Sequence, residues 1–308
     1  MSDYKHIFGP VPSRRLGFSL GVDLTPGKAC SLDCVYCQIG KTQIKTTEPS
    51  GFVPTREVIE ELDRWFSSGG CADHITLSGS GEPTLHSGFG DILTHIKARS
   101  SIPSVLLSNG SLFFRSDIRQ SACKASLVKA TLSCWDQDSF VKIHRPADGL
   151  SFEQYFEGLT AFRRDYRGEF WLEVFALQGM NSGTENMQKL ACLAAKIMPD
   201  KVHLNTVARP PMDKSAIAVP LETLEACAVL FSPAAEIVAE CKGRENSAMV
   251  LSEASVLGLL KRHACTVSQL SSVFRCKPES ITGLLAPMEK SGKIRAERTG
   301  NDVFYVSL

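Results

Sequence analysis

The sequence has 308 residues, of which 43% are hydrophobic and 22% are charged, and its formal net charge is +1. This length accommodates one large domain with a small appendage, and the near-neutral charge argues against a polyanion-binding surface over the whole molecule. Because neither an apolar run of about 18 residues nor the apolar stretch of a signal peptide is present, we expect a cytoplasmic protein with no membrane segment, whose eleven cysteines are thiols or metal ligands.

Short runs of β-branched and aliphatic residues alternate with longer amphipathic stretches over most of the chain. The expected strands are 20–24, 74–78, 104–108, 127–133, 170–177 and 201–206. The expected helices between them are 54–68, 88–98, 115–122, 137–143, 151–166 and 184–198. This alternation is typical of βαβ units with a parallel sheet. Six repeats predict an α/β fold in the form of a partial (β/α)6 TIM-like barrel.

The pattern changes type after residue 206. The further expected elements are a helix at 220–231, a strand at about 236–241, helices at 252–262, 266–274 and 278–290, and strands at 293–297 and 303–307. Three helices followed by a hairpin predict a small C-terminal winged helix-turn-helix domain. We expect the boundary near 245–251, which divides the chain into a barrel domain (1–248) and a winged-helix domain (249–308).

Three cysteines, Cys30, Cys34 and Cys37, lie within eight residues just after the first expected strand. Each thiolate can bind one iron of a four-iron cluster, which leaves the fourth iron without a protein ligand. An open iron can chelate the amino and carboxylate groups of S-adenosylmethionine (SAM) and pass an electron into its sulfonium, which releases a 5′-deoxyadenosyl radical. A zinc site is disfavoured because no nearby His or CxxC completes four ligands.

The spacing CxxxCxxC, with Tyr36 before the last cysteine, resembles the signature of the radical SAM superfamily. The likeness spans residues 8–206 and includes the glycine-rich turn Gly79-Ser80-Gly81-Glu82-Pro83-Thr84 and the strand ending Ser108-Asn109-Gly110. Residues 9–17 are similar to a subgroup of poorly characterised iron–sulfur oxidoreductases related to wybutosine-type tRNA-modifying enzymes. The resemblance implies an enzyme with one site-differentiated [4Fe-4S] cluster, SAM, and an electron donor such as flavodoxin or ferredoxin.

The resemblance also implies which residues contact SAM. It places the turn at 79–84 against the methionine amino group, where glycines allow close backbone approach and a carboxylate can accept from an ammonium. The strand ends of the family face SAM, although for Ser108 and Asn109 a plain turn is an equal alternative. The cofactor-binding candidates from the resemblance are Tyr36, Gly79, Gly81, Glu82, Pro83, Asn109, Ser133 and Arg145.

Strand alternation indicates which side chains face the barrel interior. Lys129 and Thr131 share a face with Ser133, whereas Cys134 falls on the opposite face and should pack in the core. A charged residue inside a covered sheet needs a partner, which SAM, substrate or an internal hydrogen-bond network could supply. The cavity-lining candidates are Asp23, Glu173, His203 and Asn205.

Two further features concern the paired arginines and the remaining cysteines. Arg14 and Arg15 could close over the same mouth, or they could be solvated or paired with surface carboxylates. The remaining cysteines show no tight spacing, so a second cluster has no motif to support it.

The third expected C-terminal helix tests whether the winged helix reads DNA. A groove-reading helix exposes Arg, Lys, Asn or Gln, but here the positions outside the apolar set are Ser280, Thr282, Gly283, Ala286 and Pro287. Pro287 should also kink or shorten the helix. The positive charge lies nearer the wing, in Lys290, Lys293, Arg295 and Arg298, where contacts with phosphates are non-specific. We therefore doubt sequence-specific DNA binding and favour an RNA clamp, a protein-substrate dock or a packing module.

These observations predict a radical SAM enzyme that abstracts hydrogen from a substrate, with RNA favoured. One alternative is radical modification or activation of a protein or peptide substrate. An alternative of another class is an iron–sulfur redox-sensing transcription regulator, but such a sensor needs neither the turn at 79–84 nor polar strand ends. A scaffold that binds SAM without cleaving it is disfavoured by the complete cysteine triplet.

Overall fold

The computed structural model describes residues 4–13, 15–25, 27–238, 251–300 and 302–308. Its main sheet has eight strands in the order β1-β2-β5-β6-β7-β8-β9-β10. These strands are β1 (Ile7–Ser13), β2 (Gly17–Val22), β5 (His74–Leu77), β6 (Ser104–Leu107), β7 (Leu127–Thr131), β8 (Glu169–Ala176), β9 (Lys201–Thr206) and β10 (Glu236–Ile237). Neighbouring strands from β2 to β10 are parallel, and β1 pairs with β2 in antiparallel register.

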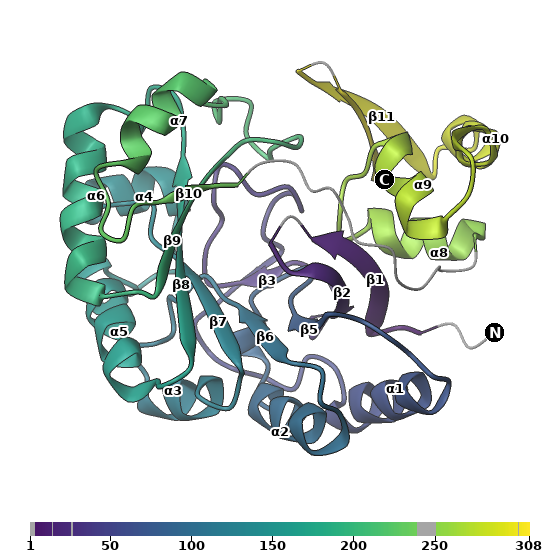
Figure 1. The fold of residues 1–308 in the computed structure, drawn as a ribbon, viewed down its shortest axis with the longest axis horizontal. Coiled ribbons are helices and arrows are strands. Elements are labelled where there is room, and N and C mark those ends of the chain that lie inside the picture. The colour runs from purple at the N-terminus through teal and green to yellow at the C-terminus, as the bar shows by residue number, and fades with distance from the viewer. Residues whose placement is uncertain (1–3, 14, 26, 239–250, 301) are drawn as a thin grey trace.

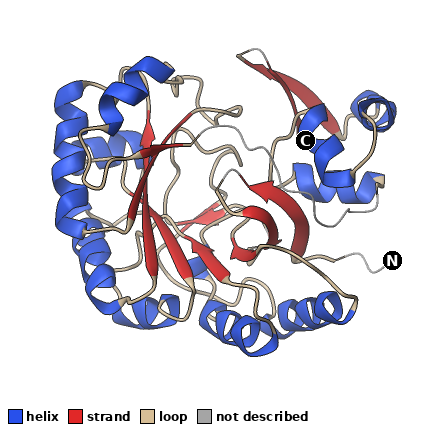
Figure 2. Ribbon diagram, in the orientation of Figure 1, coloured by secondary structure: helices blue, strands red, loops and turns tan. Residues whose placement is uncertain are grey.

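Seven helices form an arc around the outer side of this sheet (Figures 1 and 2). They are α1 (Thr55–Ser67), α2 (Phe89–Arg99), α3 (Ser116–Ala122), α4 (Gln137–His144), α5 (Phe152–Asp165), α6 (Thr184–Ile197) and α7 (Leu221–Ala228). Each buries an apolar stripe against the sheet, as α1 does with Val58, Leu62 and Trp65. The main hydrophobic core therefore lies between the strands and this arc.

The mostly parallel sheet confirms the expected α/β class, and the six expected strands correspond to β2 and β5–β9. Its linear order, with β1 and β10 as the edges among the described residues, agrees with an incomplete barrel. Strand β1 was not expected, because Gly9, Pro10 and Pro12 read as turn signals. Proline is tolerated in edge strands, and β1 is an edge. Residues 239–241 of the strand expected at 236–241 lie outside the described residues.

Three short elements near the cysteines were also not expected. Strands β3 (Ala29–Cys30) and β4 (Ile44–Lys45) pair in parallel on either side of the cysteine loop. The 3-10 helix η1 (Pro83–Leu85) follows the glycine-rich turn. Elements of two or three residues are too short for hydrophobic periodicity to reveal them.

The C-terminal module, residues 251–308, contains three helices and a hairpin. They are α8 (Glu253–Leu260), α9 (Val267–Phe274), α10 (Pro278–Lys290), β11 (Ile294–Thr299) and β12 (Asp302–Ser307). The module has its own apolar core, against which Phe8 and Val11 of β1 pack, and it lies beside β1 in Figure 1. Helix α10 continues through Pro287 to Lys290, so the expected shortening is wrong. Pro287 lies in the last turn, where few backbone hydrogen bonds remain to be lost.

Most of the expected domain boundary at 245–251 lies outside the described residues. Among the residues that the structure describes, no helix has the length and apolarity that a membrane span requires.

Candidate functional site

The cysteine loop follows the carboxyl end of β2 and is joined to the glycine-rich turn after β5. Cys30 lies in β3, and the neighbouring Ala29 carbonyl accepts a hydrogen bond from the Glu82 N–H at 2.9 Å. A Cβ on Gly81 would lie 2.0 Å from that carbonyl oxygen, so only glycine permits this approach. On the other side, the backbones of Asp33 and Val35 bond to the end of α4. The fold therefore brings together the two motifs that the sequence analysis singled out.

Polar side chains surround the sulfurs of this loop. The Asn109 amide donates to Cys30 Sγ at 3.4 Å, and His144 Nδ1 lies 3.1 Å from Cys34 Sγ. Burial, reinforced by Glu82, raises the pKa of the Cys30 thiol to about 12, and burial also raises the pKa of Cys34. Metal binding must displace these protons, so metal affinity depends on pH.

Lys28 places a positive charge beside the three sulfurs. Burial by itself lowers the pKa of Lys28, but the neighbouring Cys37, Cys30 and Cys34 outweigh this effect, so the pKa is raised. The Lys28 ammonium also donates to the Gly40 carbonyl and lies 3.6 Å from Asp33. A fixed cation here favours a metal centre of net negative charge.

The donor set fits an iron–sulfur cluster better than a single metal ion. No three His, Cys, Asp or Glu side chains of the described residues converge as ligands of one ion. In a cubane each cysteine binds a different iron, so three sulfurs on one loop need not share a coordination sphere. Zinc requires four ligands around one point, and this loop offers three. The buried His144 Nε2 has no hydrogen-bond partner among the described residues.

Glu82 is buried and connects the glycine-rich turn to the end of β6. Its carboxylate accepts from the Thr84 backbone and hydroxyl, from the Ser108 hydroxyl at 2.7 Å and from the Asn109 N–H at 2.7 Å. Burial raises the pKa of Glu82, and these hydrogen bonds oppose the rise. Glu82 thus organises the turn, and its contact with the SAM ammonium stays a prediction, as does that of Pro83, the first residue of η1.

Two candidates at the later strand ends have partners within the chain. The fully buried Ser133 hydroxyl accepts from the Phe175 N–H at 2.9 Å. The Arg145 guanidinium donates to Asp213 at 2.5 Å. The backbone hydrogen bond from Ser215, together with Arg145, lowers the pKa of Asp213 to about 2. Direct contacts of Ser133 and Arg145 with SAM stay predictions.

The loop around residue 213 lies against the cysteine loop. Its Met212 N–H donates to the Cys37 carbonyl at 2.8 Å, and its Asp213 N–H donates to the Val35 carbonyl at 3.0 Å. Tyr36 stacks on Phe175 with ring centroids 4.1 Å apart. These contacts hold Tyr36 between the cysteines and the barrel interior.

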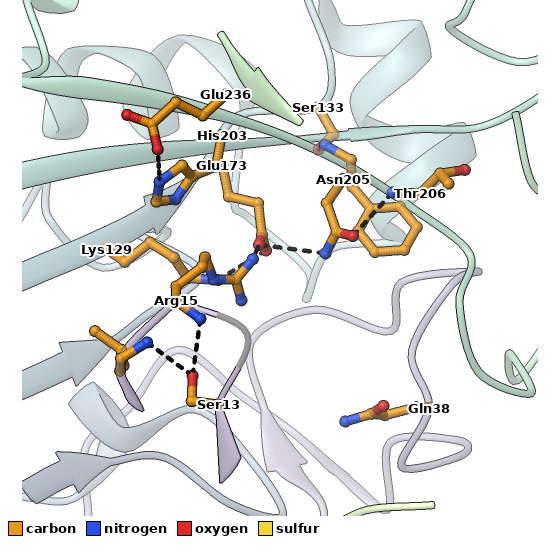
Figure 3. Close-up of polar contacts among 12 residues, drawn as sticks. Ser13, Arg15, Gln38, Lys129, Ser133, Glu173, His203, Asn205, Thr206 and Glu236 are labelled. Atoms are coloured by element: carbon orange, nitrogen blue, oxygen red, sulfur yellow. Dashed lines mark hydrogen bonds and ion pairs between the residues drawn. The ribbon is translucent and has the colours of Figure 1, made fainter. Parts of the chain in front are cut away.

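Inside the barrel, a charged cluster forms around Glu173 of β8 (Figure 3). The carboxylate pairs with Lys129 of β7 at 2.8 Å and with Arg15 at 2.5 Å, and Asn205 of β9 donates to it at 3.4 Å. Arg15 precedes β2, so it enters from the amino-terminal ends of the parallel strands rather than over the mouth at their carboxyl ends. An internal network therefore supplies the partners that the buried carboxylate needs, and its contact with SAM or substrate stays a prediction. Arg14 lies outside the described residues.

His203 and Asp23 occupy different surroundings. His203 is 2% exposed, packs edge-on against Trp171 and lies 3.6 Å from Glu236. Burial, with Arg15 as the next cause, lowers its pKa to about 4, so the ring is neutral near pH 7. Asp23 is separate from this cluster, because its carboxylate accepts from Ser80 and from Arg262 of the C-terminal module.

Three residues that the structure places at these sites were not predicted from the sequence. Lys129 was noted on the interior face, and a lysine within a buried strand is itself a signal for a charged partner. His144 lies beside Arg145 in the sequence but has no motif of its own. Arg262 follows α8 and carries no local signal, because its partner is 239 residues away. Cys134 is fully buried in the main core, as expected.

The family model of the radical SAM superfamily matches residues 24–191. A protein of Brachyspira hyodysenteriae named GTPase Obg is 33% identical over 306 residues, which cover 98% of this chain but only 45% of that protein. This chain contains no GxxxxGK[ST] segment, the phosphate-binding loop of many GTPases. The UPF0026 protein MJ1312 of Methanocaldococcus jannaschii is 29% identical over 309 residues, which cover 97% of this chain and 95% of that protein.

Solved structures share the fold at low sequence identity. A structure of TYW1 with a lysine-pyruvate adduct bound has a TM-score of 0.54 and 16% identity, and covers 74% of this chain and 76% of that one. SuiB of Streptococcus suis bound to the precursor peptide SuiA has a TM-score of 0.51 and 12% identity, and covers 67% of this chain and 44% of that one.

Proposed function

Because this chain belongs to the radical SAM superfamily and is therefore a radical SAM enzyme, we propose that Cys30, Cys34 and Cys37 hold one [4Fe-4S] cluster beside a SAM site at the turn 79–84. When bound, the cluster supplies an electron from an external donor such as flavodoxin or ferredoxin to SAM, whose cleavage gives the radical that abstracts hydrogen from the substrate. The observation that carries this proposal is the 2.9 Å hydrogen bond between Glu82 and Ala29, which joins the two motifs. The reduced cluster requires a reducing compartment, so we place the enzyme in the cytoplasm.

The chain's own residues orient and enclose the reacting groups. Asn109 donates to one cysteine sulfur and Lys28 balances negative charge beside all three. Near the amino-terminal ends of the parallel strands, Leu16, Val105, Leu127 and Trp171 form a buried apolar cluster.

We also propose that the C-terminal module is a winged helix that forms a separate domain and docks an RNA substrate. Its support is the order of three helices and a hairpin around a core of its own. The favoured substrate class rests on this module and on the resemblance of residues 9–17 to a subgroup related to tRNA-modifying enzymes. A protein or peptide substrate is the competing outcome of the experiment below.

The test is anaerobic reconstitution of the full chain with iron and sulfide, followed by dithionite and SAM, with chromatography for 5′-deoxyadenosine. Cys34→Ser should lose the cluster absorbance and at least about 100-fold of the product, because each cysteine supplies one of three anchors. The matched control is Cys192→Ser, which changes an exposed cysteine of α6 and should behave as wild type. Zinc or no metal on the three thiols would contradict the proposal.

The same reaction over RNA and protein fractions identifies the substrate class. With deuterated substrate fractions, we expect deuterium to enter 5′-deoxyadenosine only when the RNA fraction is present. Transfer from the protein fraction would instead support a protein substrate. Tight binding to an operator with no 5′-deoxyadenosine would support the sensor alternative.

A further inference from the structure

A pocket of about 440 Å³ lies where the C-terminal module meets the barrel. Ser80 of the glycine-rich turn and Lys28 beside the cysteines form part of its wall, and Lys261 and Arg262 close it from the C-terminal side. This volume is within the range of small-ligand sites. The pocket therefore adjoins the proposed SAM site and is built by both parts of the chain.

Positive charge dominates the lining. Its charged members are Lys5, Lys28, Lys41, Lys261 and Arg262 against Asp23 alone. Two of the cations are compensated, because Arg262 pairs with Asp23 at 2.7 Å and Lys28 lies near Asp33.

The other three cations, Lys5, Lys41 and Lys261, are exposed. Their ammonium groups have no hydrogen bond or ion pair within the part of the chain that the structure describes. Three uncompensated ammonium groups around one pocket favour an anion with several oxygens. Lysines bind phosphate as mobile point charges.

The hairpin of the C-terminal module offers less free charge than its sequence indicates. Lys293 pairs with Glu253 at 2.5 Å, and Arg295 pairs with Glu297 at 2.5 Å. Exposed pairs of this kind are weak, but each one cancels a charge that a phosphate would otherwise meet. The pocket, not the hairpin, is therefore where unpaired cations gather next to the proposed reaction site.

We propose that this pocket binds a phosphate group of the RNA substrate, which Lys41 of the barrel and Lys261 of the C-terminal module contact. The inference rests on the proposed function, because it takes the substrate to be RNA. Docking of the backbone here places the neighbouring nucleotides beside the turn at 79–84. The C-terminal module then contributes a side chain to the substrate site.

The experiment measures binding of a short fluorescein-labelled single-stranded RNA to the reconstituted full chain by fluorescence anisotropy at several salt concentrations. For the double variant Lys41→Ala/Lys261→Ala we expect RNA binding that is about tenfold weaker. The slope of log affinity against log salt concentration should also be smaller by about 1.4, because each phosphate contact with a single strand contributes about 0.7. Lys41→Arg/Lys261→Arg keeps both charges and should restore both quantities.

The matched control is Lys97→Ala/Lys196→Ala, which removes two exposed lysines from α2 and α6 and should bind as wild type. Thermal unfolding confirms that each variant is folded. Wild-type binding by the pocket variant, or an equal loss in the control, would overturn the inference. The inference would also be overturned if the protein did not bind RNA but bound poly-glutamate through Lys41 and Lys261. Formation of 5′-deoxyadenosine by the wild type without RNA tests the proposed function separately.

Discussion

His144 lies at the end of α4 and contacts the cysteine loop through both its backbone carbonyl and its ring. Its Nδ1 lies 3.1 Å from Cys34 Sγ, and the side chain is fully buried. Burial lowers the pKa of His144 to about 3, so the ring is neutral and carries one proton. A thiolate bound to iron can only accept, which requires that proton to be on Nδ1 in the proposed holoenzyme. Hydrogen bonds to the sulfurs set the reduction potential of iron–sulfur clusters.

We therefore expect His144→Phe to make the midpoint potential of the reconstituted cluster more negative. If this hydrogen bond stabilises the reduced cluster over the oxidised cluster by about 1 kcal/mol, its loss lowers the midpoint potential by roughly 40 mV for one electron. The measurement is a redox titration followed by electron paramagnetic resonance. His144→Asn keeps a donor near the Nδ1 position and should recover most of the shift, and an unchanged midpoint in the phenylalanine variant would show that this hydrogen bond has no such role.

His203 predicts a pH dependence of stability. Its pKa is about 4 in the folded chain and about 6.5 in an unfolded chain, so between these values the unfolded state binds more protons. The free energy of unfolding must then fall as the pH decreases through this window. Between pH 6.5 and pH 4.5 the contribution of this residue is about 2 kcal/mol.

Urea unfolding of the wild type and of His203→Gln at the two pH values isolates this contribution from that of the carboxyl groups. We expect the wild type to lose about 2 kcal/mol more than the variant. Equal losses would mean that His203 is already solvated or protonated in the folded chain.

For individual side chains, the sequence revealed those whose roles follow from local periodicity. The two-residue alternation along each strand placed Glu173 of β8 and Asn205 of β9 on the interior face of the sheet, and the two side chains meet in the interior cluster. It could not identify Arg15 as a partner of Glu173, because a turn residue points wherever the tertiary structure directs it. The same holds for His144, whose contact with Cys34 depends on how α4 packs against the cysteine loop.

Among the secondary-structure elements, the glycine-rich turn sets the strictest steric requirement. A Cβ on Gly81 would lie 2.0 Å from the Ala29 carbonyl oxygen, which belongs to the backbone and cannot rotate away. We expect Gly81→Ala to separate the turn from β3 and to weaken SAM binding by at least about tenfold, in line with the loss of one backbone hydrogen bond in a buried site. Calorimetric titration of the reconstituted protein with SAM measures this change.

The control for Gly81→Ala is Gly283→Ala in α10, where no atom lies within 4 Å of the added Cβ. Alanine in a helix is favoured over glycine by about 0.5–1 kcal/mol, so this variant should be slightly more stable and should bind SAM normally. If Gly81→Ala binds SAM as tightly as the control, the turn tolerates a side chain and the steric argument is wrong.

Long helices and central strands were predictable because their apolar periodicity extends over several helical turns or over several alternating strand residues. Helix α10 begins and ends where the sequence placed it, and β9 does likewise. Strand β1 was missed because its prolines dominate the local pattern, whereas its place at an edge becomes clear only once the sheet is assembled. The short strands around the cysteines depend wholly on the loop that they enclose.

Among the residues that the structure describes, one ion pair connects the C-terminal module to the barrel beside the glycine-rich turn. Arg262 donates through Nε to Asp23 at 2.7 Å and through a terminal nitrogen to the Lys5 carbonyl at 2.8 Å, and its guanidinium lies over the Phe8 ring. Asp23 is 3% exposed and also accepts from Ser80. Removal of the arginine therefore leaves a buried carboxylate with fewer donors.

We expect Arg262→Ala to reduce the free energy of unfolding by about 2–3 kcal/mol, less than the 3–5 kcal/mol of a fully buried pair because Ser80 still donates to Asp23. Urea unfolding measures this loss, and small-angle scattering should show a larger radius of gyration as the module separates from β1. Arg262→Lys should recover only part of the stability, since an ammonium cannot reproduce the two directed contacts of a guanidinium. Lys277→Ala removes an exposed cation of the same module and should change neither quantity. An unchanged radius and stability in Arg262→Ala would show that the apolar contacts of Phe8 and Val11 alone hold the module in place.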